Sequence, residues 1–334
     1  AAFVCADLAR REAGGEKYIA LDIGPTGRLL KPLGDLPFEE AVTAFAKVVS
    51  EGVKNGADLI VIETMNDSYE TKAAVIAAKE NSDLPIIVTN VFDDSAKLMT
   101  GADIEAMVAM LEGLGVDALG MNCSLGPVQM KRLVPDFMKN ASIPVAVVPN
   151  AGLPRSENGK TMFDVDADEF SDIMADIASQ GVRIIGGCCG TTPEYIRKTA
   201  EKVKNIPIKE IEAKNITVVS SYTHAVKIED EPILIGERIN PTGKKKFKEA
   251  LRNKDMEYIL KEGISQQEKG VHILDVNVGL PEIDEKAMIC EALSGLQVVS
   301  DLPLQIDTVD AEAMEAAMRI YNGKPLVNSV NGNK

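Results

Sequence analysis

Short runs of β-branched and aliphatic residues alternate with longer segments in which apolar residues recur every three or four positions. The short runs are flanked by Gly, Pro, Asn and Asp, as is typical of strands in α/β proteins. Up to residue 204, the pattern predicts strands at 18–23, 59–64, 86–92, 118–123, 145–150 and 184–189. It predicts helices at 37–56, 68–80, 103–115, 127–140, 168–181 and 193–204. Such alternation indicates parallel strands joined by helical crossovers.

The alternation stops at 205–232, a polar stretch of mixed character, and then resumes. The second series predicts strands at 233–239, 273–278, 304–308 and 326–330, and helices at 245–270, 284–299 and 311–321. We therefore expect two domains, at 1–212 and 231–334, joined by a linker at 213–230.

Six strand–helix units followed by four predict an α/β fold of two (β/α)8 TIM-type barrels, both incomplete in this chain. One such barrel needs about 250 residues, and the chain has 334. The first barrel would lack its first two strands, and the second would be an N-terminal half. The chain has no initiator Met, and we expect a fragment truncated at both ends. One or two open, doubly wound sheets are the alternative.

Composition narrows the class of protein. The formal net charge of −15 repels phosphate backbones, so we expect no nucleic acid partner. No apolar run approaches the ~18 residues of a membrane-spanning helix, so we expect no membrane partner either. Five cysteines, an odd number, with no secretion signal at the start predict a reducing, cytoplasmic location.

Three of the cysteines stand at the ends of predicted strands. Cys123 ends one strand, and the adjacent pair Cys188 and Cys189 ends another. In a barrel, these ends lie on one rim, where three sulfurs could meet. Zinc accepts thiolates in tetrahedral geometry, and a catalytic zinc site keeps its fourth position open. From spacing alone, buried free cysteines are the alternative.

The strings Met121-Asn122-Cys123 and Gly186-Gly187-Cys188-Cys189-Gly190-Thr191-Thr192-Pro193 closely resemble the zinc motifs of the homocysteine S-methyltransferase family. The resemblance implies that Cys123, Cys188 and Cys189 bind zinc and that the homocysteine sulfur takes the fourth position. It also implies that Glu63, at a strand end, binds the substrate ammonium; an exposed loop acid is the alternative. Asn150 either fills the open zinc position without substrate or caps a turn.

The later strands each end in Asp, Asn or Glu, on what would be one rim. Such side chains can pair with a heterocycle that presents alternating donors and acceptors, although Asp and Asn are also common turn residues. The strands closely resemble the pterin-binding domain of dihydropteroate synthases and folate-dependent methyltransferases. The positions that match pterin-binding residues are Glu237, Asn240, Asp275, Asn277, Asp307 and Asn328.

A thiol-methyltransferase domain followed by a pterin domain resembles the arrangement of the cobalamin-dependent methionine synthase family. That resemblance implies that a zinc-activated homocysteine thiolate accepts a methyl group from methylcobalamin, which 5-methyltetrahydrofolate recharges. The products would be methionine and tetrahydrofolate, and cobalamin would be bound by a module absent from this chain. The alternatives are a cobalamin-independent homocysteine S-methyltransferase with another methyl donor, an inactive zinc-binding fragment, or a structural zinc protein.

Overall fold

The structure, a computed structural model, describes residues 2–157, 159–229, 231–330 and 332. The chain divides into two compact units, Ala1–Lys214 and Asn215–Lys334. Both consist of parallel strands connected by helices, so the predicted α/β class is confirmed. Among the described residues, none of the helices combines the length and apolar character needed to cross a membrane.

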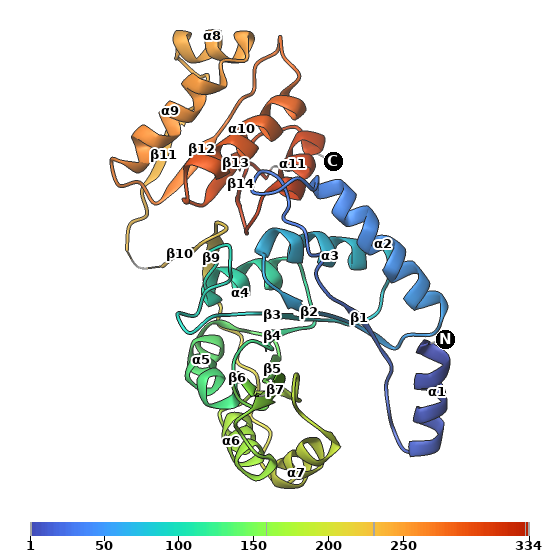
Figure 1. The fold of residues 1–334 in the computed structure, drawn as a ribbon. Helices are drawn as coiled ribbons and strands as arrows, with labels where there is room; N and C mark the ends of the chain where they lie inside the picture. Colours follow the sequence, from blue (N-terminus) through green and yellow to red (C-terminus); the bar gives the residue numbers. More distant parts are fainter. Residues whose placement is uncertain (1, 158, 230, 331, 333–334) are drawn as a thin grey trace. The chain divides into compact units, whose positions relative to one another are not determined.

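The first unit contains a six-stranded parallel sheet in the order β1-β2-β3-β4-β5-β8, and Figure 1 labels its strands β1 to β5. Its strands are β1 (Ala20–Ile23), β2 (Leu59–Met65), β3 (Ile86–Asn90), β4 (Ala118–Asn122), β5 (Val145–Val148) and β8 (Ile184–Ile185). The crossover helices are α2 (Phe38–Lys54), α3 (Ser68–Asn81), α4 (Ile104–Gly113), α5 (Pro127–Asn140) and α6 (Ala167–Ser179). Because the strands run parallel, their carboxyl ends share one rim.

Burial along β1 shows how the core forms. Leu21 and Ile23 are buried and Asp22 is exposed, as the period of two in a strand requires. Gly52 of α2 admits the Leu21 side chain, since a Cβ on Gly52 would lie 2.4 Å from a Leu21 methyl carbon. Side chains from strands and helices together make one apolar core, which includes Phe45, Ile60, Val75, Met107, Val147 and Phe137.

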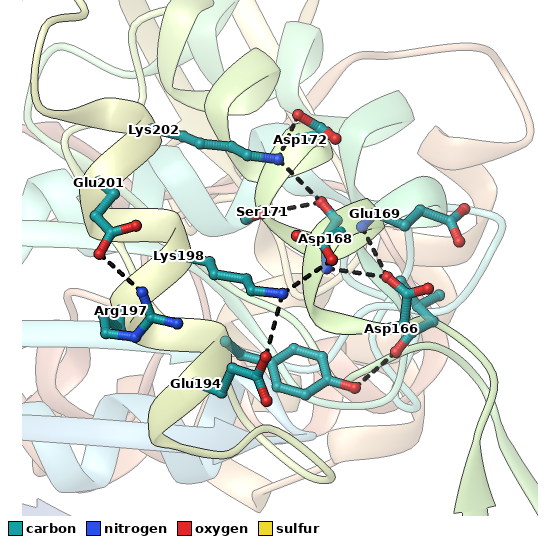
Figure 2. A network of polar contacts seen from close by, with 12 residues as sticks. Asp166, Asp168, Glu169, Ser171, Asp172, Glu194, Arg197, Lys198, Glu201 and Lys202 are labelled. Atoms are coloured by element: carbon teal, nitrogen blue, oxygen red, sulfur yellow. Dashed lines mark hydrogen bonds and ion pairs between the residues drawn. The ribbon is translucent and has the colours of Figure 1, made fainter.

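Helix α7 (Pro193–Val203) begins shortly after the Cys188–Cys189 pair and packs on α6. Figure 2 shows lysines of α7 directed at acidic side chains of α6. Lys198 Nζ lies 2.9 Å from a carboxylate oxygen of Asp168, and Lys202 Nζ lies 2.5 Å from one of Asp172. These exposed ion pairs link the helix that follows the two cysteines to α6.

Three elements of the first unit lie outside the predicted alternation. Helix α1 (Ala2–Ala13) precedes β1, and the antiparallel strands β6 (Pro154–Glu157) and β7 (Lys160–Phe163) follow β5. The side chain of Arg10 in α1 donates to Asp58, whose carboxylate also accepts the N–H of Ile19. These long-range polar contacts are invisible to a reading of local periodicity.

The second unit contains a four-stranded parallel sheet in the order β11-β12-β13-β14. Its strands are β11 (Ile235–Ile239), β12 (Ile273–Val276), β13 (Leu304–Asp307) and β14 (Leu326–Asn328). The helices are α8 (Lys245–Asn253), α9 (Met256–Gln267), α10 (Glu285–Val299) and α11 (Ala311–Ile320). The single helix predicted at 245–270 is wrong: Lys254 takes φ +53° and ends α8, and the Asp255 carboxylate caps α9 by accepting the Tyr258 N–H.

The segment expected as a linker, 213–230, carries an antiparallel hairpin, β9 (Thr217–Ser220) with β10 (Ala225–Ile228). The hairpin belongs to the second unit and is hydrogen-bonded to other residues of it. The Ser220 N–H donates to the Lys324 carbonyl, and the buried Tyr321 hydroxyl donates to the Ser220 carbonyl. A Cβ on Gly323 would lie 2.3 Å from that same carbonyl oxygen, so the close approach requires glycine.

Candidate functional sites

The sulfurs of Cys123, Cys188 and Cys189 all lie within 4.8 Å of one another. The Sγ atoms of Cys123 and Cys189 are 3.9 Å apart. Cys123 and Cys188 are half-buried, and Cys189 is exposed. The structure therefore brings together the three cysteines that the sequence singled out. Cys123 directly follows β4, whereas β8 ends at Ile185, earlier than predicted, so that Cys188 and Cys189 lie in the loop after it.

Backbone hydrogen bonds hold the two cysteine-bearing strand ends to β5, which lies between them. The Cys123 N–H donates to the Val148 carbonyl at 3.0 Å, and the Cys188 N–H donates to the Pro149 carbonyl at 2.8 Å. Cys123 itself takes φ +56°, in the left-handed region that residues with a side chain rarely adopt. The backbone therefore turns sharply at Cys123, directly after the end of β4.

The position directly after Cys189 has no room for a side chain. Gly190 takes φ +81°, and a Cβ there would lie 2.3 Å from the Phe163 ring. The Ala151 N–H donates to the Cys189 carbonyl at 2.9 Å. Glycine at position 190 therefore permits both the turn and the close packing of β7 beside the cysteine pair.

The three thiols differ in how readily they lose their protons. A hydrogen bond from the Cys188 thiol lowers the pKa of Cys123 to about 5. The pKa of Cys188 is raised, first by that hydrogen bond to Cys123, and the pKa of Cys189 is raised, first by its burial. One thiolate therefore forms readily, whereas three thiolates this close repel one another. A soft divalent cation would relieve the repulsion, so the donor set fits zinc.

Glu63 interacts electrostatically with the Cys123 sulfur. The pKa of Glu63 is raised by partial burial, then by Asp22 and by Cys123. Asp22 was not among the predicted site residues, although its position in the first predicted strand placed a carboxylate near the rim. Burial also raises the pKa of Asp22, so two interacting carboxyl groups lie on this side of the sulfur cluster.

Asn150 is buried, with 3% of its surface exposed. Its Oδ1 accepts the Cys189 N–H at 3.1 Å, and its side chain also hydrogen-bonds to the Cys123 sulfur and so helps to lower the pKa of that thiol. One carboxamide therefore bridges the strand ends that carry the cysteines.

The second unit gathers oxygen and amide groups at its own rim. Asn277 Nδ2 donates to Asp307 Oδ2 at 3.0 Å, and Gln305 Nε2 donates to Asp275. Asp307 pairs in register with Asn328. Sequence reasoning missed Gln305, whose position two residues before Asp307 puts it on the same face of β13.

Asp275 is the most perturbed carboxyl group of this rim. Burial raises the pKa of Asp275 to about 6; Gln305 opposes the shift by donating to the carboxylate, and Asp307 and Glu237 add to it. The Asn240 side chain also hydrogen-bonds to Asp275, while Asn240 Oδ1 accepts the Thr242 N–H at 2.9 Å. The structure thus places five of the six predicted rim residues at or directly after the ends of neighbouring strands, whereas Glu237 is the middle residue of β11.

Comparison with known proteins agrees with these two units. Residues 1–203 match the sequence model of the homocysteine S-methyltransferase family, and residues 236–334 match that of the pterin binding enzymes. The chain is 32% identical over 330 residues to the methionine synthase of Mycobacterium leprae and 32% identical over 324 residues to that of Mycobacterium tuberculosis. These alignments cover 95% of this chain but 27% of each relative.

Among solved structures, the chain is similar to the apo form of the homocysteine methyltransferase MmuM from Escherichia coli. The identity is 24% and the TM-score is 0.48, with 60% of this chain and 67% of that chain covered. On the strength of the sequence match over residues 1–203, the chain belongs to the homocysteine S-methyltransferase family.

Proposed function

We propose that Cys123, Cys188 and Cys189 hold a zinc ion at which homocysteine is activated as a methyl acceptor. The observation that carries the proposal is the convergence of these three sulfurs within 4.8 Å, at the carboxyl ends of parallel strands in a member of the homocysteine S-methyltransferase family. Three protein ligands leave one position of a tetrahedral zinc site for the substrate sulfur.

We assign separate roles to the cysteines, to Asn150 and to Glu63. A free thiol is mostly protonated near neutral pH, and bound zinc would supply the positive charge that keeps the substrate sulfur as a thiolate. The three cysteines hold the metal, and Asn150 fixes two of them through the Cys189 N–H and the Cys123 sulfur. Glu63 accepts hydrogen bonds from the substrate ammonium, which orients the sulfur toward the cluster.

In the proposed reaction the homocysteine sulfur attacks a methyl group, the S–C bond forms, and the donor keeps the electron pair of its broken bond to carbon. We propose methylcobalamin, carried by a module outside this chain, as the donor. The chain matches the methionine synthases of two mycobacteria across both units, which supports methionine as the product of the methyl transfer.

For the second unit we propose binding of 5-methyltetrahydrofolate, which would recharge the methyl donor and leave tetrahydrofolate. The rim offers carboxylate acceptors on Asp275 and Asp307 and an amide donor on Asn277, the kinds of group that pair with a pterin. The match of residues 236–334 to the pterin binding enzymes supports this assignment.

We further propose that both units are (β/α)8 barrels in the whole protein, with domains at 1–212 and 231–334 and a connection at 213–230. Sequential parallel strands with helical crossovers, as in β1 to β5, are the repeating unit of such barrels. In both units the proposed site residues cluster toward the carboxyl ends of the strands, where barrel enzymes carry their active sites.

Methionine formation from homocysteine and added methylcobalamin tests the proposed function. The zinc-loaded chain should form methionine, and a Cys188→Ala variant that still folds should not. If the zinc-loaded chain forms no methionine with methylcobalamin but forms it with S-methylmethionine or betaine, the chain uses a different methyl donor. No turnover with any of the three donors would contradict the proposal for this chain.

A further inference from the structure

A buried carboxamide joins two strand ends that are not neighbours in the sheet. Asn122 is the last residue of β4 and has 0% of its surface exposed. Its Oδ1 accepts the Thr64 N–H at 2.8 Å, and its Nδ2 donates to Thr64 Oγ1 at 2.7 Å. Thr64 belongs to β2, and β3 lies between β2 and β4. The Asn122 side chain therefore spans the end of β3.

Each partner in this link adjoins a residue of the proposed site. Thr64 follows Glu63, and Asn122 precedes Cys123. Thr64 takes φ +61° and Cys123 takes φ +56°. A β-branched residue such as threonine is strongly disfavoured in that region, so its backbone would relax without an external restraint. The two hydrogen bonds between Thr64 and Asn122 are such a restraint.

Packing alone does not explain an asparagine at this place. The other residues of β4 are Ala118, Leu119, Gly120 and Met121, all buried and none with a polar side chain. A carboxamide in such surroundings is destabilising unless its hydrogen bonds are satisfied, whereas leucine would fill a similar volume without that requirement. Both ends of the Asn122 amide are satisfied by the single residue Thr64.

We propose that Asn122 is a positioning residue that fixes the Glu63 carboxylate relative to the Cys123 sulfur, so that the site selects thiols carrying an ammonium group. The inference rests on the proposed function, since it assigns Glu63 to the substrate ammonium. The Cys123 end has its own support, because its N–H donates to the Val148 carbonyl. Loss of the link should therefore displace Glu63 and leave the sulfur cluster in place.

The test compares two thiols on the zinc-loaded chain by titration calorimetry. Homocysteine carries the ammonium, and 4-mercaptobutanoate lacks only that group. Asn122→Leu should keep about one zinc per chain and weaken homocysteine binding about 10-fold, as expected for loss of a well-oriented charged hydrogen bond. Binding of 4-mercaptobutanoate should change less than about twofold. Equal weakening of both thiols, loss of zinc, or no change in either affinity would overturn the proposal.

Two further variants keep the test decisive if Asn122→Leu does not fold. Thr64→Val removes the hydroxyl and keeps the hydrogen bond from the backbone N–H. It should therefore weaken homocysteine binding by about threefold and leave 4-mercaptobutanoate binding unchanged. Thr64→Ser keeps both bonds and should bind homocysteine like the wild-type chain. Wild-type behaviour of Thr64→Val, or weakening of homocysteine binding in Thr64→Ser as large as in Thr64→Val, would count against a positioning role.

Amide hydrogen exchange separates this inference from the proposed function. The Thr64 N–H should be protected in the wild-type chain and exchange faster in Asn122→Leu, with Cys123 N–H protection unchanged. If the wild-type chain binds no homocysteine, the proposed function fails, and the exchange data still decide whether Asn122 holds Thr64. Unchanged Thr64 protection in the variant would overturn the positioning role whatever the ligand data show.

Discussion

The rim of the first unit carries sulfur, and the rim of the second carries oxygen and amide nitrogen. Cys123, Cys188 and Cys189 lie within 4.8 Å of one another, and one of their thiols readily loses its proton while the other two resist. In the second unit, Asn277 already donates to Asp307. Parallel strands with helical crossovers supply both rims, so the chemistry of each depends on the few residues that end its strands.

The difference predicts that the two rims respond differently to metal. Three adjacent thiolates repel one another unless a cation neutralises them, so the sulfur rim should need zinc to be complete. The oxygen rim pairs carboxylates with amide donors, as Gln305 does for Asp275, and is satisfied by its own hydrogen bonds. Variants in each rim can test this contrast.

The largest effect is expected from removing one sulfur. Cys188→Ala leaves two thiolates, and we expect zinc affinity to fall more than about 100-fold, a loss greater than that usually seen for residues that only support a ligand. Competition with a chromophoric chelator measures the affinity. Cys290→Ala, outside the cluster, is the matched control and should bind zinc like the wild-type chain. Equal affinities for the two variants would contradict a site made of these three cysteines.

The next effect concerns the carboxylate beside the sulfurs. Glu63→Gln removes the charge proposed to hold the substrate ammonium, and homocysteine affinity should fall about 10- to 50-fold, as for a hydrogen bond between charged groups. Calorimetric titration of the zinc-loaded variant measures it, with 4-mercaptobutanoate as the control ligand. If both thiols lose affinity alike, Glu63 does not bind the ammonium.

In the oxygen rim the expected effect is on stability. The pKa of Asp275, raised to about 6 by burial, exceeds the ordinary value of a carboxyl group, about 3.9. Ionisation of Asp275 therefore disfavours the folded state, and its contribution to stability is lost as pH rises through that window. Asp275→Asn should raise the free energy of unfolding at pH 7.5 by about 1–2 kcal/mol. Urea unfolding at pH 4.5 and 7.5 checks this; a variant with the wild-type pH dependence would show that Asp275 ionises normally.

The smallest effect should come from the outer helices. Lys198 lies between Asp168 and Glu194 on the surface shared by α6 and α7. Exposed ion pairs contribute little, so Lys198→Met should lower the melting temperature by about 1–2 °C at low salt. In 1 M salt the difference should disappear because the charges are screened. A larger loss that persists in salt would mean that Lys198 stabilises the fold by packing.

Much of the fold could be predicted because its signals are local. Each strand of both sheets appears as an apolar run, and most of the predicted site residues lie at or shortly after a strand end. Parallel topology then places these ends together. The break in the helix predicted at 245–270 could not be predicted from the sequence pattern. It is caused by the left-handed backbone conformation of the single residue Lys254, which does not change the apolar periodicity.

Other features depend on contacts between distant residues. The link from Asn122 to Thr64 joins positions 58 residues apart, and Asn122 looks like any polar residue at a strand end. The hairpin in the expected linker is fixed by Ser220 and Tyr321, which are 101 residues apart. Such contacts become visible only when the chain is folded.

Zinc content per chain tests the central claim most directly. Elemental analysis of the wild-type chain should give about one zinc per chain, Cys290→Ser should give the same, and Cys189→Ser should retain little or none after dialysis against a chelator. A folded wild-type chain without zinc, or a Cys189→Ser variant that keeps a full equivalent, would contradict the assignment of Cys123, Cys188 and Cys189 as a zinc site.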